Sequence, residues 1–536
     1  MPRLTIDGKE IEVPAGTTVL QAALSQGLEI PHYCYHPGLS ISGNCRMCLV
    51  EMEKSPKLVI SCATQAADGM VITTNSEKVR AARAAMMEFF LINHPLDCPI
   101  CDQAGECRLQ DYAVEHGTGT SRFVETKLSL NKAVDLGSHV MLDQERCIQC
   151  SRCIRFCEEV TGTGELGFFR RGERTVIGTV PGRPLDNAYS GNVVDLCPVG
   201  ALTLKEFRFQ TRVWYLKNTP SVCAGCARGC NVVVAVGQQQ VLMTTQGQLD
   251  DRIKRIVPRF NAAVNGHWIC DEGRLSHERA SAAPPLDRAQ APPGTRVEWE
   301  DALTRAATLL KSAAPGAAAA ILSPRLSSED LFAWRALFAS LDSARIGVRR
   351  LVRGQDDALL IRADKGANSR GADWILGREA TEQGVVAAIA RGEITTLLVV
   401  GDPLDPADTF ALDAAGRAKV RNVIFVGAFL SGAAEAASVL LPAAAWSEAE
   451  GTMVNFQGRI QRVSRCHLPR GERRPGWKIA AELAAACGAG LRHWTSAQEV
   501  LRSMAESVRE YAGVDFETIS LLGVEGGQAA MSAAAP

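Results

Sequence analysis

The second half of the chain alternates short apolar runs with amphipathic stretches. Residues 318–322, 397–400 and 423–426 are apolar throughout and have the length of strands. Residues 299–311 and 328–341 instead repeat their apolar positions at helical spacing. Because helices that alternate with buried strands cover the faces of a parallel sheet, this pattern predicts an α/β domain.

The first residues show the pattern of a small β-grasp unit of the ubiquitin type. Two short strand-like segments, 4–6 and 10–13, flank Asp7-Gly8, a pair that favours a hairpin turn. Thr17 or Thr18 can cap the helix that follows, and Gly27 ends it. We expect four residues of this helix to face inward: Val19, Leu20, Ala23 and Leu24.

A longer helix is predicted to begin after Ser76, a suitable N-cap, and to stop at Pro95. His94 would then lie at the helix end. The apolar positions of this helix are Val79, Ala82, Met86, Phe89 and Phe90.

Two later segments need an interpretation of their own. Residues 277–296 are rich in Ala, Pro and Arg, which predicts a linker or a meandering surface segment. Residues 423–446 are apolar but are interrupted by Gly, Glu and Pro, so we expect buried α/β structure there rather than a membrane span.

Composition narrows the function only slightly. A chain of 536 residues with 46% hydrophobic and 22% charged residues is an ordinary globular protein of several domains. The formal net charge of -1 gives no reason to expect a nucleic-acid partner. The first ten residues contain no apolar signal core, so we do not expect export.

The cysteines change the picture most. Of the eighteen cysteines, fifteen fall with one histidine into four compact groups in the first half of the chain. Because each iron–sulfur cluster takes four thiolate-class ligands, four such groups suit four clusters, and a chain with several clusters is most simply an electron-transfer protein. The groups are Cys34, Cys45, Cys48, Cys62; His94, Cys98, Cys101, Cys107; Cys147, Cys150, Cys153, Cys197; and Cys223, Cys226, Cys230, Cys270.

The first group has the spacing C-x10-C-x2-C-x13-C. A long loop followed by a tight pair suits a [2Fe–2S] cluster on a β-grasp scaffold, although the plant-type spacing is different. Gly43 would let backbone amides approach the sulfurs. A zinc site is the alternative, but structural zinc sites usually pair two short knuckles.

The second group has the spacing H-x3-C-x2-C-x5-C. A lone histidine is more often an ordinary surface or core residue, but its interval to the three cysteines favours ligation by His94. A neutral imidazole in place of a thiolate removes one negative charge, which by itself raises the reduction potential of the bound cluster.

The third group begins with C-x2-C-x2-C-x3-C, and Cys197-Pro198 follows much later. No second triplet precedes Cys197, so only one [4Fe–4S] cluster can be completed, with Cys147, Cys150, Cys153 and Cys197 as ligands. Cys157 is then left over, and we expect a buried packing thiol. Zinc suits this tight interval less well.

The fourth group has the spacing C-x2-C-x3-C-x39-C. We expect a further [4Fe–4S] cluster, with zinc or a site that has lost its metal as the alternatives, because the last spacer is long. Cys466 and Cys487 have no partners in the sequence and are expected to be ordinary buried residues.

Three strings and the order of the four groups closely resemble the G-subunit family of respiratory complex I, the NADH–quinone oxidoreductase: SGNCRMCLVE, NHPLDCPICDQAGECRLQD and RCIQCSRCIRFCEEVTGTGELGF. The resemblance is strong over about residues 1–275 and weaker to about 490. It implies that the first three groups hold a [2Fe–2S] cluster, a [4Fe–4S] cluster with one histidine ligand, and an all-cysteine [4Fe–4S] cluster. The fourth group resembles an additional [4Fe–4S] cluster of some bacterial members, which lies off the main path.

Residues 438–442, 450–455 and 458–461 resemble the molybdopterin-binding oxidoreductases. Many of those enzymes place a Cys, selenocysteine or Ser on the metal. The comparable place here, residues 323–326 (Ser-Pro-Arg-Leu), offers no thiolate, and Ser327 or Ser328 is the alternative ligand. We therefore expect a structural relic without molybdenum.

The predicted fold class is a multidomain chain of α+β and α/β type. We expect a β-grasp [2Fe–2S] ferredoxin-like domain over 1–78, a [4Fe–4S] domain with one histidine and three cysteine ligands over 79–120, a ferredoxin-like [4Fe–4S] domain over 140–216, a [4Fe–4S] domain of molybdopterin-oxidoreductase type over 217–273, and a degenerate molybdopterin-oxidoreductase-like α/β domain over 297–490.

The resemblance implies an electron-transfer subunit that relays electrons from the FMN subunit toward quinone. Its expected partners are the other subunits of the peripheral arm, namely the flavin- and NADH-binding subunit and the quinone-side iron–sulfur subunits. Contact with the membrane would come only through these partners, at the cytoplasmic face of the inner membrane. No catalytic residue, NADH site or quinone site is expected on this chain, which has no convincing Gly-rich dinucleotide fingerprint.

Two other functions remain open from the sequence. The same chain could serve a soluble NAD-linked formate dehydrogenase or hydrogenase, and the formate dehydrogenase alternative predicts molybdenum or tungsten in the protein. A zinc-stabilised interaction scaffold would instead contain zinc without iron.

Overall fold

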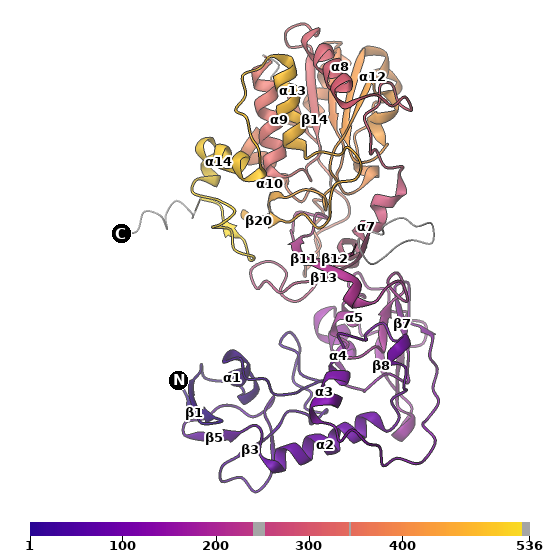
Figure 1. The fold of residues 1–536 in the computed structure, drawn as a ribbon, viewed down its shortest axis with the longest axis vertical. Coiled ribbons are helices and arrows are strands. Elements are labelled where there is room, and N and C mark those ends of the chain that lie inside the picture. The colour runs from indigo at the N-terminus through magenta and orange to yellow at the C-terminus, as the bar shows by residue number, and fades with distance from the viewer. Residues whose placement is uncertain (239–251, 342–344, 528–536) are drawn as a thin grey trace. The chain divides into compact units, whose positions relative to one another are not determined.

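The computed structural model describes residues 1–238, 252–341 and 345–527. The chain divides into two compact units, Met1–Leu216 and Lys217–Pro536 (Figure 1). Each unit is described separately below.

The first unit opens with a five-stranded sheet in the order β2-β1-β5-β3-β4. The predicted hairpin is present, and both of its turn residues, Asp7 and Gly8, have positive φ angles. Strand β5 pairs in parallel with β1 and antiparallel with β3, as in a β-grasp arrangement. The bounds are β1 Arg3–Ile6, β2 Lys9–Glu12, β3 Leu49–Met52, β4 Val59–Ile60 and β5 Met70–Thr73.

Helix α1 (Val19–Ser25) packs its apolar face on this sheet. Thr18 caps the helix, and the Gln21 side chain completes a capping box. The prediction for the inward face is wrong at one position: Leu24 is 40% exposed, and Ala22 is buried instead. The buried residues of this short helix are Val19, Leu20, Ala22 and Ala23.

Helix α2 (Glu77–Leu91) begins after Ser76 as predicted but ends before His94, which lies in the following loop. The buried face of this helix follows its apolar positions only in part. The buried positions are Val79, Arg83 and Met87, whereas Phe89 is 69% exposed. The Arg83 guanidinium donates to the Leu49 carbonyl. This hydrogen bond lets a charged side chain lie on the buried face, where hydropathy favours an apolar residue.

The remainder of the first unit consists of short elements joined by loops. Helix α3 spans Arg108–His116, α4 Arg152–Arg155 and α5 Asn192–Leu196. A three-stranded sheet has the order β10-β7-β6, and β8 and β9 form a separate antiparallel pair. The strands are β6 Val134–Asp135, β7 Val140–Leu142, β8 Leu166–Phe169, β9 Val176–Thr179 and β10 Leu202–Leu204.

The second unit begins with a three-stranded sheet, β11 (Leu216–Val222), β12 (Asn231–Gly237) and β13 (Ile253–Pro258). The short helices α6 (Asp271–Arg274) and α7 (Ser276–Arg279) follow it.

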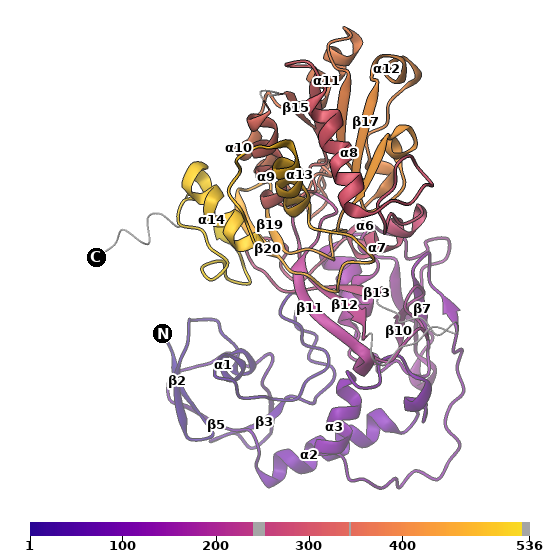
Figure 2. The same cartoon turned by 45° about the horizontal axis from the view of Figure 1, so that its top comes forward.

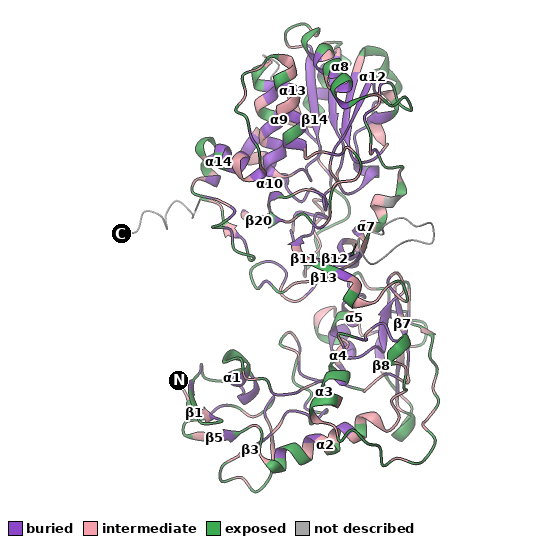
Figure 3. Ribbon diagram, in the orientation of Figure 1, coloured by how far each residue is buried: buried purple, intermediate pink, exposed green. Residues whose placement is uncertain are grey.

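The predicted parallel sheet forms the centre of the second unit. Its order is β15-β14-β16-β17-β18, and all neighbouring strands are parallel. The strands are buried along most of their length (Figure 3). Their bounds are β14 Ala318–Leu322, β15 Arg345–Val348, β16 Thr396–Val400, β17 Asn422–Gly427 and β18 Val439–Pro442.

Helices cover both faces of this sheet (Figure 2). One face packs against α8 (Trp299–Lys311), α9 (Ser328–Ser340) and α13 (Gly476–Cys487), and the other packs against α11 (Glu382–Ala390). The remaining elements are α10 Ser369–Leu376, α12 Ala414–Lys419, α14 Ala497–Ser507, β19 Gly451–Val454, β20 Arg459–Val463 and β21 Val524–Glu525. The α/β pattern predicted from the sequence is therefore confirmed.

The proline-rich residues 277–296 do not form a free linker. Leu286 and Ala289 are fully buried, and Gln290 bridges Leu440 of β18 in antiparallel fashion. The segment thus lies along the edge strand of the parallel sheet, where its backbone hydrogen bonds compensate for the missing neighbour. Composition alone suggested that this segment is exposed, because prolines surround the few residues that anchor it.

The apolar stretch 423–446 contributes β17 and β18 to the buried sheet, as predicted. None of the helices within the described ranges has both the length and the hydropathy required for a membrane crossing.

The sheet core gives a stability prediction. Leu398 is a fully buried residue of the central strand β16. Replacing it in the variant Leu398→Ala should lower the free energy of unfolding of the second unit by about 2–5 kcal/mol, because burial is lost and a cavity is left. Scanning calorimetry measures the effect. Val386→Ala, at an exposed position of α11, is the control and should change this free energy by less than about 1 kcal/mol; equal effects of the two substitutions would contradict the core assignment.

Candidate metal centres

The first set of sulfur ligands lies in the loops of the β-grasp unit, and all four of its side chains are buried. The Cys45 and Cys62 thiols donate to the Cys34 sulfur, which lowers the pKa of Cys34. Cys62 also forms a hydrogen bond with Cys48, so hydrogen bonds connect all four sulfurs. The structure therefore brings this predicted set together.

Backbone amides also point at the first set. The Asn44 and Cys45 N–H groups donate to the Cys34 sulfur, and the Tyr33 N–H donates to Cys45 Sγ at 3.4 Å. Gly43 has a φ of +65°, a conformation that glycine adopts without strain, and it leads the chain into this turn. Gly43 itself packs against Ile60, so its effect on the sulfurs comes through the amides that follow it.

The second set is less compact. Cys101 and Cys107 are buried, but Cys98 is exposed at the start of a single helical turn. The sulfur of Cys101 lies against backbone, because a Cβ built on Gly200 would stand 2.1 Å from Cys101 Sγ. A side chain at position 200 would therefore displace this ligand.

His94 and the second set have a charged neighbour in common. Burial lowers the pKa of His94 to about 4, and the Arg146 and Lys127 cations contribute to this shift. Arg146 also interacts with the Cys101 sulfur, which places the imidazole and that cysteine near the same guanidinium. At neutral pH the ring is neutral, the form that ligates metal.

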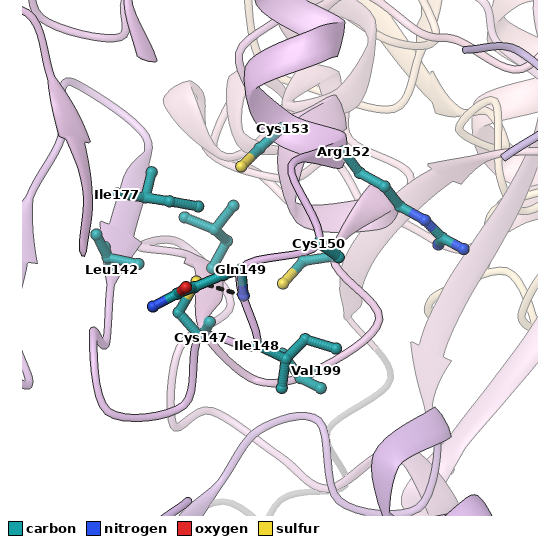
Figure 4. Close-up of a pocket in the computed structure, with 12 residues that line it drawn as sticks. Leu142, Cys147, Ile148, Gln149, Cys150, Arg152, Cys153, Ile177 and Val199 are labelled. Carbon is teal, nitrogen blue, oxygen red and sulfur yellow. Dashed lines mark hydrogen bonds between the residues drawn. The ribbon is translucent and has the colours of Figure 1, made fainter. Parts of the chain in front are cut away.

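The third set lines a small cavity (Figure 4). Its four cysteines share the wall with apolar side chains such as Leu142 and Ile177. The sulfurs of Cys150 and Cys153 point into the cavity, whereas the Arg152 guanidinium points away from it. The chemistry of this pocket, soft donors in an apolar enclosure, suits a cluster.

Burial controls the acidity of the third set. It raises the pKa of Cys150 to about 11 and that of Cys153 well above its ordinary value, and the neighbouring cysteines contribute to both shifts. Four thiolates cannot coexist here unless positive charge enters the cavity. The Gln149 N–H donates to Cys147 Sγ at 3.4 Å and compensates only in part.

The remaining cysteine of this region, Cys157, is fully buried, as predicted. It is not part of the cavity wall. Instead it forms a hydrogen bond with Glu165, and burial raises the pKa of its thiol to about 12.

Arginine side chains connect the first and third sets. The Arg155 guanidinium donates to the Cys34 carbonyl at 2.6 Å and to the Cys150 carbonyl at 3.4 Å. Arg152 donates to the Tyr35 carbonyl and to the Leu196 carbonyl. Tyr35 directly follows Cys34 of the first set, and Leu196 directly precedes Cys197 of the third. These two sets are therefore neighbours in space.

The third set is also a neighbour of the second. Gly200, which touches Cys101, follows Cys197 by one short turn, and Arg146, which interacts with Cys101, directly precedes Cys147. The third set therefore lies beside both of the others, although it follows the second in the sequence.

The fourth set belongs to the second unit and also lines a small cavity. All four cysteines are buried. Cys270 is the N-cap of α6 and accepts the Gly273 N–H at 3.3 Å, and the Gly225 N–H donates to Cys223 Sγ at 3.4 Å. A Cβ on Gly273 would stand 3.0 Å from Cys223 Sγ, so the closing loop lies directly on the sulfurs despite its long spacer.

Within the described part of the chain, no group of three His, Cys, Asp or Glu side chains is arranged to hold a metal ion as it stands. The last two cysteines lie apart from the four sets. Cys466 is buried, as predicted, whereas Cys487 is only half-buried at the end of α13.

The place that would correspond to a molybdenum ligand is filled by a buried ion network. Ser323 donates to Asp402 at 2.7 Å, and the fully buried Arg325 guanidinium pairs with Asp402 at 3.1 Å and Asp408 at 2.7 Å. The hydroxyls of Ser327 and Ser328 are also in use, since the first caps α9 and the second donates to the Thr452 carbonyl. These residues do not suit a molybdenum site.

Comparison with known proteins gives four family matches. Residues 2–77 match a 2Fe-2S iron-sulfur cluster binding domain, and residues 83–122 match the NADH-ubiquinone oxidoreductase-G iron-sulfur binding region. Residues 137–203 match the ferredoxin-like domain of NADH-quinone oxidoreductase subunit 3, and residues 350–486 match molybdopterin oxidoreductase.

Two solved structures are similar in part. One is an NAD+-reducing [NiFe]-hydrogenase in the H2-reduced state, at 32% identity and a TM-score of 0.36, over 40% of this chain and 91% of the other. The second is the acetylene hydratase of Pelobacter acetylenicus, at 10% identity and a TM-score of 0.40, over 56% of this chain and 73% of the other.

Curated relatives that are named as the G subunit of NADH-quinone oxidoreductase are more similar in sequence. That of Rickettsia felis is 44% identical over 356 residues, which are 65% of this chain and 50% of the relative. That of Rickettsia conorii is 44% identical over 353 residues, with the same coverage. The chain spans about half the length of these relatives. Over this shared part the chain is similar to the G subunits of NADH-quinone oxidoreductase, and its matches to a 2Fe-2S domain, to the iron–sulfur region of that family and to molybdopterin oxidoreductase agree with the resemblance found in the sequence.

Proposed function

We propose that the chain is the electron-transfer iron–sulfur subunit of an NADH–quinone oxidoreductase (complex I), and that it relays electrons from a flavin subunit toward quinone. The main support is that three sulfur sets lie next to one another in the first unit. Arg155 connects the first set with the third, and Gly200, close to the third set, lies against Cys101 of the second. Electron transfer between such sites needs spacing, insulation and a set potential rather than acid–base groups.

The proposed cofactors are one [2Fe–2S] cluster on the first set and a [4Fe–4S] cluster on each of the other three. When bound, these clusters supply one-electron transfer. The sulfur ligands hold them, and the apolar residues around the third set exclude water from that cavity. No molybdenum is part of the proposal, because Arg325 and its carboxylate partners occupy the corresponding place.

The relatives are named as subunits of NADH-quinone oxidoreductase, which supports partners in such a complex. We propose that these are its flavin- and NADH-binding subunit and its quinone-side iron–sulfur subunits. We infer a position at the cytoplasmic face of the inner membrane, with membrane contact only through those subunits. A pull-down of the full chain followed by mass spectrometry tests this assignment.

Elemental analysis and EPR of the anaerobically purified, reduced chain test the cofactor set. We expect iron and sulfide, one [2Fe–2S] signal and three [4Fe–4S] signals, without molybdenum or zinc in comparable amount. Molybdenum or tungsten at one atom per chain would favour a formate dehydrogenase instead. Zinc without iron would indicate an interaction scaffold and refute electron transfer.

The substitution Cys150→Ala tests the third set. It should abolish one [4Fe–4S] signal and leave the others, because a cluster that loses a ligand in a water-poor cavity has no ready substitute. Cys157→Ala is the matched control, since this thiol is equally buried nearby but does not line the cavity. EPR of the control should retain every signal; if both variants lose the same signal, or neither loses one, the assignment is wrong.

The substitution Gly200→Ala tests the second set without removing a ligand. Its new Cβ would meet Cys101 Sγ at 2.1 Å, so the sulfur must move and the cluster of this set should be lost. The missing EPR signal should differ from the one that Cys150→Ala removes. Gly167→Ala, where a Cβ meets only Phe169 at 3.8 Å, is the control and should retain all signals. Normal signals in Gly200→Ala would show that Cys101 is not a ligand.

A further inference from the structure

The cavity of the fourth sulfur set is not enclosed by its own cysteine loops alone. Three residues of the α/β domain, Leu360, Ile361 and Lys365, complete its wall. They belong to the segment that runs from β15 toward α10, which we call the covering loop (residues 356–366). The cysteines lie about a hundred residues earlier in the sequence, so this contact depends on the folded second unit.

Several hydrogen bonds fix the covering loop on the cysteine turn. The Arg228 guanidinium donates to the Leu359 carbonyl at 2.8 Å and to the Leu360 carbonyl at 3.2 Å. The Ala227 N–H donates to the Asp364 carbonyl at 2.9 Å. The Arg362 N–H donates to the Cys226 sulfur, so the loop supplies a hydrogen bond to a ligand.

A cation-π stack strengthens this attachment. The Arg362 guanidinium lies 3.8 Å from the centroid of the Phe456 ring, and Arg228 lies 5.1 Å from the same centroid. Arg228 is part of the cysteine turn, Arg362 belongs to the covering loop, and Phe456 belongs to the turn between β19 and β20. The ring therefore ties the three segments together.

The covering loop also places a buried charge beside the sulfurs. Only 6% of the Lys365 side chain is exposed, and its Nζ pairs with Glu272 Oε2 at 2.6 Å. Both residues line the cavity. The two side chains therefore bring charges of opposite sign to the wall that the sulfurs share.

We propose that the covering loop completes the fourth iron–sulfur site and that Lys365 raises the reduction potential of its cluster, while Glu272 lowers it. The inference rests on the proposed function, because it takes a [4Fe–4S] cluster to be held by Cys223, Cys226, Cys230 and Cys270. Reduction adds one electron to this site. A buried ammonium stabilises the added negative charge, whereas a carboxylate destabilises it. The α/β domain thus has a defined task, which is to insulate this site and to set its potential.

Potentiometric titration of the full chain, followed by EPR under anaerobic conditions, tests the proposal. Lys365→Met keeps the approximate length of the side chain and removes its charge, so it should shift the midpoint of one [4Fe–4S] signal to lower potential. Glu272→Gln should shift the same signal to higher potential. Lys365→Arg should retain the wild-type midpoint, because it keeps the charge. The other signals should not move in any of these variants.

Lys311→Met is the matched control, since it removes an exposed lysine of the same unit at the end of α8. It should leave every midpoint unchanged. The proposal is overturned if the shifts of Lys365→Met and Glu272→Gln are absent, have the same sign, or do not exceed that of the control. If Lys365→Met retains no fourth cluster, the sign of the shift in Glu272→Gln decides.

The wild-type protein separates this inference from the proposed function. If it shows the [2Fe–2S] signal and only two [4Fe–4S] signals, with Cys223→Ala removing none, the proposed relay stands and the inference about the covering loop fails. If it contains no iron at all, both fail.

Discussion

The burial of several sulfur ligands beside one another is the constraint on which this structure depends. Burial raises the pKa of Cys153 and of Cys230 well above the ordinary value, and each neighbouring sulfur adds to the effect. Ligation nevertheless requires thiolates. The charge must therefore be compensated from inside each cavity. The local fold and the cofactor stabilise each other for this reason.

The backbone conformation around the ligands reflects the same constraint. Arg46, Gln149 and Ser151 all have φ angles near +60°, a conformation that costs a non-glycine residue about 1–2 kcal/mol, and each stands between two cysteines of a C-x2-C pair. Successive amides can then point toward sulfur, as the Gln149 N–H does toward Cys147. Where even a Cβ would be too large, glycine is present, as at Gly200 beside Cys101.

The sequence predicted the regular elements well because period and turn chemistry are local properties. The Asp7-Gly8 turn, the Thr18 cap and the three apolar strands are all confirmed. The errors arose where a distant partner decides. Arg83 is buried in α2, where its guanidinium reaches a carbonyl of β3, and residues 277–296 are anchored by the edge of a sheet that is completed only after residue 438. The spacing of the cysteines predicted four groups. It could not predict which groups lie side by side, because that depends on side chains such as Arg155, which belongs to no ligand motif.

The α/β half places a buried ion network where folds of this kind bind their ligands. Ser323, Arg325, Asp402 and Asp408 lie at the carboxyl ends of β14 and β16. Removing one member of such a network costs about 3–5 kcal/mol, because an uncompensated charge stays buried. The network thus stabilises the sheet and fills this place at the same time. Arg325 also donates to the Lys365 carbonyl at 2.9 Å, so the network holds the covering loop from behind. The same arginine that fills the ligand-binding edge of the sheet therefore positions the lysine that faces the fourth set of sulfurs.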